Sequence, residues 1–274
     1  MNQYAVWGNP IAQSKSPRIH QLFAKQTGRE LAYVAKLGDE IKFETQLLQF
    51  FADGASGANI TAPFKERAFA LADEYSEGCL QAEACNTLKR LEDGRLYADN
   101  TDGAGLVADL KRLGWLNTGQ KILILGAGGA TKGVLYPLLK AEQHITIYNR
   151  TLEKAVNLAE KFAKFGPIQT ACINELITQS FDLIINATSL GLQGKYVELP
   201  SKLLRSANIY DMQYAMNMQT PFLNYARTQG AIHCQDGLGM LVGQAGYAFQ
   251  LWEGVMPDIK CTLLELKSEM ENNK

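Results

Sequence analysis

Short apolar runs and amphipathic segments take turns along the first hundred residues. The pattern predicts strands at 3–7, 31–35 and 57–60, with helices at 17–27 and 41–52 between them. Two further runs, 86–90 and 96–98, flank the turn Glu92-Asp93-Gly94 and predict a hairpin against the edge of the same sheet. This part of the chain therefore reads as a sheet with crossover helices.

A second α/β segment follows a predicted helix at 103–113 and a polar joint at 117–119. Its predicted strands are 121–125, 144–148, 183–185 and 208–210, and helices are expected to begin near residues 151 and 221. The alternation continues to about residue 236, and a last apolar helix is expected over 238–251.

We expect this last helix to cross back and pack on the first domain. The fold class predicted is α/β with two domains, a substrate domain formed by both chain ends and a Rossmann-type domain between them. The expected bounds are 1–101 with 238–274 for the first domain and 102–237 for the second. A ligand cleft between the two domains would follow.

A glycine turn stands between the apolar strand 121–125 and the helix that follows it. Its residues are Gly126, Ala127, Gly128, Gly129 and Ala130. A strand that stops at glycines lets the backbone approach a pyrophosphate, and the N–H groups at a helix N-terminus favour that charge. The third glycine of G-x-G-x-x-G is replaced by Thr131, so the motif depends on its strand–turn–helix context, and a structural turn without a ligand is the alternative.

The end of the next strand indicates which dinucleotide is bound. An NAD-binding unit usually places Asp or Glu there, on the ribose 2′-hydroxyl. This chain has Asn149, Arg150 and Thr151 instead, with Lys154 one helical step further on. Donors and a guanidinium suit a 2′-phosphate, although an Arg after a strand is often only a solvated loop residue. The sequence predicts NADP rather than NAD.

Composition narrows the class of partner. The 274 residues include 27 Lys and Arg against 28 Asp and Glu. The chain therefore lacks the excess of positive charge that favours binding to nucleic acid or to an anionic membrane surface. The start of the chain lacks a leader pattern, and no eighteen apolar residues run together, so we expect a cytoplasmic protein. Five scattered cysteines and three scattered histidines predict reduced thiols and no metal. A small-molecule partner is expected, for a monomer or homodimer.

Four polar islands lie at the ends of apolar segments, where α/β proteins place their sites. They are 14–17, 59–65, 84–87 and 99–103. The residue types leave alternatives open, because Ser16, Thr101 and Asp102 also suit helix caps. Lys65 projects from a turn fixed by Pro63, yet a lone lysine is usually a solvated surface charge.

The chain resembles the shikimate dehydrogenase family from end to end. The resemblance lies in 59–65, 84–87, 100–103, the glycine turn, 149–151, and 236–241 with Gln244. It implies NADPH-dependent reduction of 3-dehydroshikimate to shikimate, in the shikimate pathway to chorismate and aromatic amino acids. The implied acid/base pair is Lys65 and Asp102. The implied substrate-binding residues are Ser14, Ser16, Thr61, Asn86, Tyr214 and Gln244, and the implied further cofactor contacts are Thr188, Met212 and Gly237.

The residue types agree with that chemistry. Transfer of a hydride to the carbonyl carbon of a ketone leaves an alkoxide, which needs a proton. The ammonium of Lys65 can supply this proton while Asp102 orients the ammonium. Convergent Ser, Thr, Asn and Gln side chains suit a small polyol, because each unpaired buried polar group costs about 1–3 kcal/mol. The chain departs from the family pattern at Cys85, at Met216 and in the loop 191–194.

Three alternatives remain open at this point. One is an enzyme of the same architecture that also oxidises quinate or prefers NAD. Another is a different two-domain NADP enzyme, acting on a folate or a tRNA-linked glutamate. The third is a nucleotide-binding module that has lost its chemistry, although Lys65 and Asp102 are both present.

Overall fold

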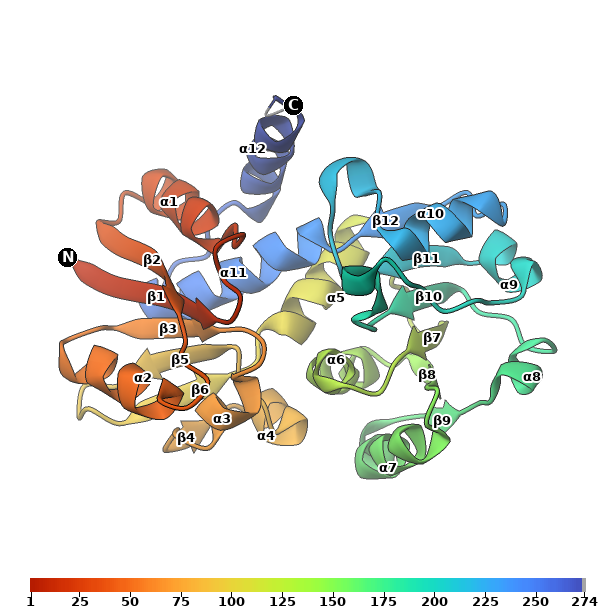
Figure 1. Cartoon of the computed structure of the whole chain (residues 1–274), viewed down its shortest axis with the longest axis horizontal. Helices are drawn as coiled ribbons and strands as arrows, with labels where there is room; N and C mark the ends of the chain where they lie inside the picture. The colour runs from red at the N-terminus through yellow and green to blue at the C-terminus, as the bar shows by residue number, and fades with distance from the viewer. Residues whose placement is uncertain (273–274) are drawn as a thin grey trace. The chain divides into compact units, whose positions relative to one another are not determined.

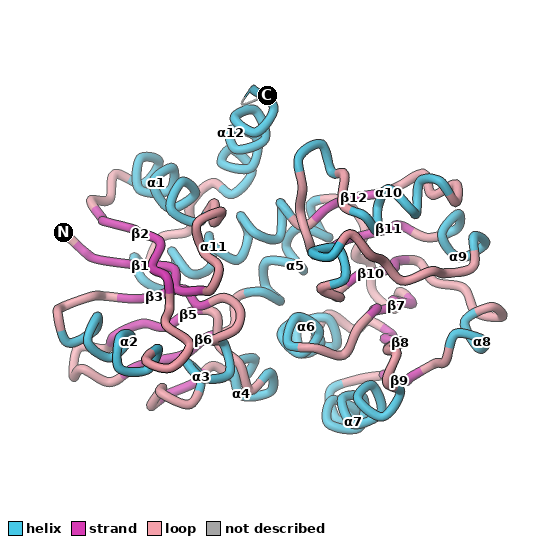
Figure 2. The backbone as a smooth tube through the Cα atoms, in the orientation of Figure 1, coloured by secondary structure: helices cyan, strands magenta, loops and turns pink. Residues whose placement is uncertain are grey.

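The computed structural model describes residues 1–272, which form an α/β protein with two six-stranded sheets (Figure 1 and Figure 2). The chain divides into two compact units. The first unit is Met1–Gly105 with Val242–Glu269, and the second is formed chiefly by Leu106–Leu241. Both boundaries fall inside helices, namely α5 (Asp102–Arg112) and α11 (Leu238–Glu253). The predicted α/β fold class is confirmed.

The first unit contains a mixed sheet with the strand order β2-β1-β3-β5-β6-β4. Its strands are β1 (Asn2–Gly8), β2 (Leu31–Leu37), β3 (Gly57–Ile60), β4 (Glu74–Tyr75), β5 (Thr87–Arg90) and β6 (Leu96–Asp99). Its further helices are α1 (Ser16–Thr27), α2 (Phe43–Ala52), α3 (Lys65–Phe69), α4 (Glu77–Ala82) and α12 (Ile259–Asn272). The predicted hairpin is β5–β6, but it does not form the edge, because β4 pairs with the outer side of β6.

Alternating side chains of β1 explain why helices cover both faces of this sheet. Tyr4 packs with Trp252 of α11, with ring centroids 4.5 Å apart. Trp7 points to the other face and packs with Phe43 of α2. Both strand residues are almost fully buried, and each such side chain contributes about 1.5–3 kcal/mol on leaving water. The sheet is therefore fixed on both faces, and the loops at its strand ends are left to carry function.

A buried histidine lies on the α11 face of the sheet. His20 of α1 is completely buried and stacks on Tyr33, with ring centroids 4.1 Å apart. Trp252 lies at 5.4 Å from the same ring. Burial lowers the pKa of His20 from its ordinary 6.5 to about 3. The ring is therefore neutral in the folded protein and behaves as an aromatic core residue.

Replacing His20 with phenylalanine is expected to make the free energy of unfolding less dependent on pH below 6.5. The folded state keeps His20 neutral, whereas the unfolded chain takes up a proton below pH 6.5, so this contribution to stability is lost as the pH falls from 6.5 toward 3. The difference in free energy of unfolding between His20→Phe and the wild type should shift by about 2 kcal/mol in favour of the variant from pH 7 to pH 5. Urea unfolding at both pH values measures it. A difference that is independent of pH would contradict the prediction, whatever the packing cost of the larger ring.

The second unit contains a fully parallel sheet with the strand order β12-β11-β10-β7-β8-β9. Its strands are β7 (Lys121–Leu125), β8 (His144–Tyr148), β9 (Ile168–Thr170), β10 (Leu183–Asn186), β11 (Asn208–Asp211) and β12 (Cys234–Asp236). Its further helices are α6 (Gly129–Lys140), α7 (Leu152–Phe162), α8 (Ile173–Leu176), α9 (Ser201–Ser206) and α10 (Pro221–Thr228), with short 3₁₀ turns η1 (Ala163–Phe165), η2 (Leu190–Gln193) and η3 (Met216–Met218). Counted from β7, this is the 3-2-1-4-5-6 order of a doubly wound nucleotide-binding sheet.

The central strand β7 has helices on both sides. Ile122 and Ile124 pack in the cluster that contains α6 and α7, whereas Leu123 and Leu125 pack in the cluster that contains α9 and α10. All four are completely buried, which explains the uninterrupted apolar run in the sequence. The strand order reverses at β7, because β8 and β9 are added on one side of it and β10 to β12 on the other. The carboxyl end of β7 therefore lies at the switch point where such sheets bind ligands.

Two negative findings apply to residues 1–272. No helix among them is long and apolar enough to cross a bilayer. Within that range, no group of three or more His, Cys, Asp or Glu side chains is arranged to hold a metal ion. Cys79 and Cys85 are buried free thiols, whereas Cys172 and Cys261 are exposed ones.

Candidate active site

The strand register of the first unit brings three polar islands together. Asn59 at the end of β3 is paired with Thr87 at the start of β5, and Thr87 is paired with Asp99 at the end of β6. The antiparallel β5 therefore begins where its two neighbours end. As a result, residues that are far apart in the sequence share one edge of the sheet.

Lys65 and Asp102 form an ion pair at that edge. Each is the first residue of its helix, α3 or α5, and Lys65 Nζ lies 2.5 Å from Asp102 Oδ2. Their side chains are 26% and 13% exposed, so the pair is reachable from solvent but largely enclosed. The backbone N–H of Cys85 donates to the carbonyl oxygen of Lys65 at 3.1 Å, which ties α3 to the chain just before β5. The arrangement places an amine and a carboxylate within hydrogen-bonding distance, which is the geometry that acid/base chemistry requires.

Asn86 and Gln244 surround the carboxylate. Asn86 is 2% exposed, and its Nδ2 donates to Asp102 Oδ1 at 2.8 Å and to Gln244 Oε1 at 3.1 Å. Gln244 comes from α11, more than 150 residues further along the chain. Four of the residues expected at the site, Lys65, Asn86, Asp102 and Gln244, are thus linked by direct contacts.

The remaining expected residues of the first unit follow β1 and β3, which are parallel neighbours. Ser14 lies in the loop before α1, and Ser16 is the first residue of that helix. Ser14 Oγ accepts a hydrogen bond from the N–H of Ser16 at 3.3 Å. The N-cap of α1 is Lys15, so the alternative reading of Ser16 as the cap is wrong. Thr61 follows β3, and its N–H donates to the carbonyl oxygen of Trp7 in β1 at 2.8 Å. Thr61 therefore lies at the carboxyl end of β3, beside the end of β1.

A cavity of about 870 Å³ lies in the second unit beside the glycine turn. One wall is the turn 126–129 with Asn149 and Arg150 at the end of β8. The opposite wall is 187–190, after β10, together with 194–198. The ring of Tyr196 stacks on that of Tyr225, with centroids 4.4 Å apart, and this contact holds the segment 194–198 against α10.

The glycine turn fits a dinucleotide. Gly126 has φ +107°, and a Cβ there would lie 3.2 Å from Thr188 Cγ2. Gly128 and Gly129 face open space, and no side chain caps the N-terminus of α6 at Gly128. The first N–H groups of this twelve-residue helix therefore remain available to a pyrophosphate. Arg150 is exposed beside the cavity, and Asn149 Nδ2 donates to the carbonyl oxygen of Thr151 at 2.8 Å, which fixes the loop around it.

The cavity contains some of the expected cofactor residues and not others. Those that line it are Gly126, Ala127, Gly128, Gly129, Asn149, Arg150 and Thr188, whereas Ala130, Thr151, Lys154, Met212 and Gly237 do not. Met212 and Gly237 lie side by side elsewhere in the unit, because a Cβ on Gly237 would be 2.3 Å from the Met212 carbonyl oxygen. Tyr214 follows β11 in the same unit, and burial raises the pKa of its hydroxyl.

Sequence reasoning missed most of the second wall of this cavity. Ser189 and Leu190, together with 194–198, line it without a recognisable motif. The order of strands in the sheet identifies these residues. Because β10 lies next to β7, the loop after β10 must border the glycine turn after β7. Strand positions were readable from the sequence, but their order in the sheet was not.

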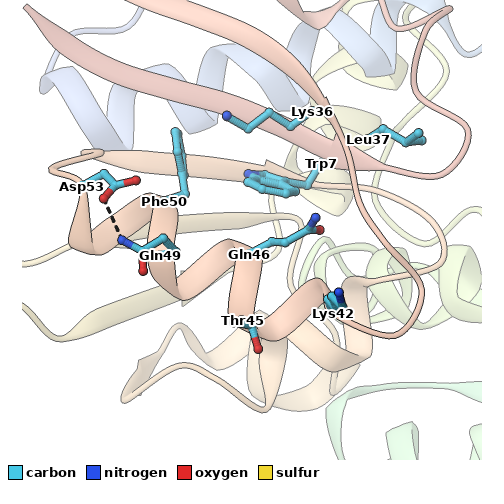
Figure 3. Close-up of a pocket in the computed structure, with 9 residues that line it drawn as sticks. All are labelled: Trp7, Lys36, Leu37, Lys42, Thr45, Gln46, Gln49, Phe50 and Asp53. Atoms are coloured by element: carbon cyan, nitrogen blue, oxygen red, sulfur yellow. Dashed lines mark hydrogen bonds between the residues drawn. The ribbon is translucent and has the colours of Figure 1, made fainter.

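A separate cavity of about 520 Å³ lies in the first unit between β1, β2 and α2 (Figure 3). Trp7 and Phe50 supply its aromatic surface, Lys36 lies over both rings, and Gln49 donates to Asp53 at 2.7 Å. Its lining includes none of the residues expected at the site. The catalytic candidates are therefore the residues around Lys65, and this cavity is not part of that site.

Comparison with known proteins identifies the family. Family models match residues 6–88 as the shikimate dehydrogenase substrate binding domain, 110–193 as shikimate/quinate 5-dehydrogenase, and 237–263 as the shikimate 5′-dehydrogenase C-terminal domain. Shikimate dehydrogenase (NADP(+)) of Glaesserella parasuis is 78% identical over 271 residues, covering 99% of this chain and 100% of the relative.

Solved structures show the same likeness. An Ael1 enzyme from Pseudomonas putida matches with a TM-score of 0.90 and 43% identity, over 97% of this chain and 98% of that one. Shikimate 5-dehydrogenase from Thermus thermophilus, solved in complex with NADP(H) and shikimate, matches with a TM-score of 0.86 and 31% identity, over 98% and 100%. The chain belongs to the shikimate dehydrogenase family.

Proposed function

We propose that this protein catalyses the reversible NADPH-dependent reduction of 3-dehydroshikimate to shikimate, with Lys65 and Asp102 as its acid/base pair. The observation that carries the proposal is the partly enclosed Lys65–Asp102 ion pair, with Asn86 and Gln244 bonded around it. The relative at 78% identity is named for this NADP-dependent activity, and the Thermus thermophilus structure holds both NADP(H) and shikimate. The reaction is a step of aromatic amino acid biosynthesis.

The residues of the first unit handle the proton. NADPH, when bound, supplies the hydride. The Lys65 ammonium donates a proton to the carbonyl oxygen as negative charge develops there, and it takes the proton back in the reverse direction. Asp102 holds the ammonium through Oδ2, while its Oδ1 is held by Asn86. General acid catalysis of this kind contributes about 10²- to 10⁴-fold to a rate.

The remaining assignments divide between the two ligands. Ser14, Ser16 and Thr61, with Asn86 and Gln244, bind the hydroxyl and carboxylate groups of the substrate in this proposal, and Tyr214 lies close to its carboxylate. The glycine turn and Arg150 hold the pyrophosphate and 2′-phosphate of the cofactor. Ala127, Ala130, Asn149, Thr151, Lys154, Thr188, Met212 and Gly237 complete the proposed cofactor contacts. We expect a monomer or homodimer that needs no nucleic-acid partner.

An assay of reduced-cofactor absorbance tests the function. Shikimate and quinate are each offered with NADP and with NAD, and we expect fast reduction of NADP by shikimate alone. Turnover of quinate or NAD at a similar rate would favour an enzyme of broader specificity. No reduction in any of the four mixtures would contradict the proposal. It would favour the alternative of a nucleotide-binding module that has lost its chemistry.

A further inference from the structure

A chain of polar side chains leads from Tyr33 of β2 to the Lys65–Asp102 pair. Its other members are buried and lie at or next to the ends of the neighbouring strands β3, β5 and β6 (Figure 1). Its members are Tyr33, Asn59, Asn86, Thr87 and Thr101. The last four are between 0% and 5% exposed, and Thr87 has no exposed surface at all. Buried polar groups of this kind are costly unless every one is paired, so their hydrogen bonds define a specific arrangement.

Backbone groups fix the orientation of the Asn86 amide. Its Oδ1 lies 2.8 Å from the N–H of Thr101, and a backbone N–H can only donate. The opposite end, Nδ2, therefore points toward Asp102 Oδ1 at 2.8 Å. This orientation makes Asn86 a donor to the carboxylate, and the flipped amide would place two oxygens against each other.

A second amide fixes the direction of the Thr87 hydroxyl. Asn59 Nδ2 lies 3.1 Å from the backbone carbonyl oxygen of Asn86, which can only accept, and 3.1 Å from Thr87 Oγ1. Thr87 thus accepts from Asn59 and gives its own proton to Asn86 Oδ1, at 2.9 Å. The Thr101 hydroxyl, at 3.3 Å, is the more distant alternative. Asn59 Oδ1 in turn accepts from the hydroxyl of Tyr33 at 2.7 Å.

Loss of the Thr87 hydroxyl would affect both amides. Asn59 would keep one fewer acceptor for its N–H groups, and Asn86 Oδ1 would lose one of its donors. The backbone groups would keep both amides in the same orientation, because Asn86 Oδ1 still accepts from the N–H of Thr101 and Asn59 Nδ2 still donates to the carbonyl oxygen of Asn86. With one partner fewer, however, each amide would be held less firmly in its place. A displacement of the Asn86 amide weakens its bond to Asp102, which is the group that holds the Lys65 ammonium.

We propose that Thr87 and Asn59 are positioning residues of the reaction, which fix the Asn86 amide so that it holds the Asp102 carboxylate in place for Lys65. The inference rests on the proposed function of the Lys65–Asp102 pair. Thr87 is completely buried and acts through Asn86 rather than on the substrate. Small displacements of a catalytic group have large effects on turnover, because catalysis depends on preorganised geometry.

The test compares Thr87→Val with Thr87→Ser and with a matched control. Thr262 is also completely buried in the first unit, and its hydroxyl accepts a hydrogen bond from Gln26 Nε2 at 2.8 Å, so Thr262→Val removes a similar bond elsewhere. We expect Thr87→Val to lower kcat for shikimate oxidation about 10-fold and to displace the kcat–pH profile, with a smaller change in KM. Thr87→Ser should restore both, and Thr262→Val should change neither.

Several outcomes separate the hypotheses. If Thr87→Val does not fold, Thr87→Ala removes the same hydroxyl without placing a second methyl group among polar partners, and the same kinetic changes are expected. A wild-type kcat and pH profile in the folded Val or Ala variant would overturn the inference, as would equal changes in Thr262→Val. A wild type that does not oxidise shikimate would overturn the proposed function and the inference with it, whereas an active wild type with an unaffected Thr87→Val overturns the inference alone.

Discussion

Replacement of Lys65 with methionine is expected to reduce kcat for shikimate oxidation by about a thousandfold and to leave NADPH affinity unchanged. Methionine keeps an unbranched apolar stem as far as Cε but removes the ammonium that pairs with Asp102. The loss follows from the usual contribution of a positioned general acid, about 10²- to 10⁴-fold. NADPH affinity is spared because every residue that lines the proposed cofactor cavity lies between 126 and 198 in the second unit.

Steady-state kinetics gives kcat, and the fluorescence of NADPH on titration with protein gives its dissociation constant. Lys25→Met is the control, because Lys25 is an exposed lysine on α1 of the same unit and should change neither quantity. A Lys65→Met protein that retains more than about a tenth of the wild-type kcat would remove Lys65 from the mechanism. A parallel loss of NADPH binding would show damage beyond the ion pair.

Local patterns in the sequence were sufficient to predict most of the elements. The apolar run of β7, followed by glycines, predicts a strand and a turn because both signals lie within ten residues. The two-residue strand β4 was missed, because Glu74 and Tyr75 become a strand only through pairing with Tyr97 and Ala98 of β6. Such a pairing is a tertiary contact, and nothing in the local sequence specifies it.

The candidate site was predictable in its residue types but not in its contacts. Lys65 and Asp102 are 37 positions apart, and their pairing depends on β5 running antiparallel between β3 and β6. Thr87 looks like an ordinary strand residue in the sequence, since threonine is common in sheets. Its position in the hydrogen-bond chain appears only when the amide orientations of Asn59 and Asn86 are fixed by backbone groups.

Replacement of Arg150 with alanine is expected to weaken NADP binding by about 10- to 100-fold and to affect NAD binding much less. Arg150 follows β8 and lines the proposed cofactor cavity, where no acidic side chain takes the place that usually reads the ribose 2′-hydroxyl. A hydrogen bond to a charged group contributes about 1.5–3 kcal/mol, which corresponds to this range of affinity. NAD lacks the 2′-phosphate and therefore has no such bond to lose.

Calorimetric titration with NADP, NAD and 2′,5′-ADP measures the effect without any turnover. Lys140→Ala is the matched control, because Lys140 is an exposed cation at the end of α6 in the same unit and does not line the cavity. Arg150→Lys should retain part of the affinity, since an ammonium keeps the charge but cannot form the paired bonds of a guanidinium. An equal loss of NADP and NAD affinity in Arg150→Ala would place Arg150 on the part that the two cofactors share. The preference for NADP would then have to come from other residues of the cavity.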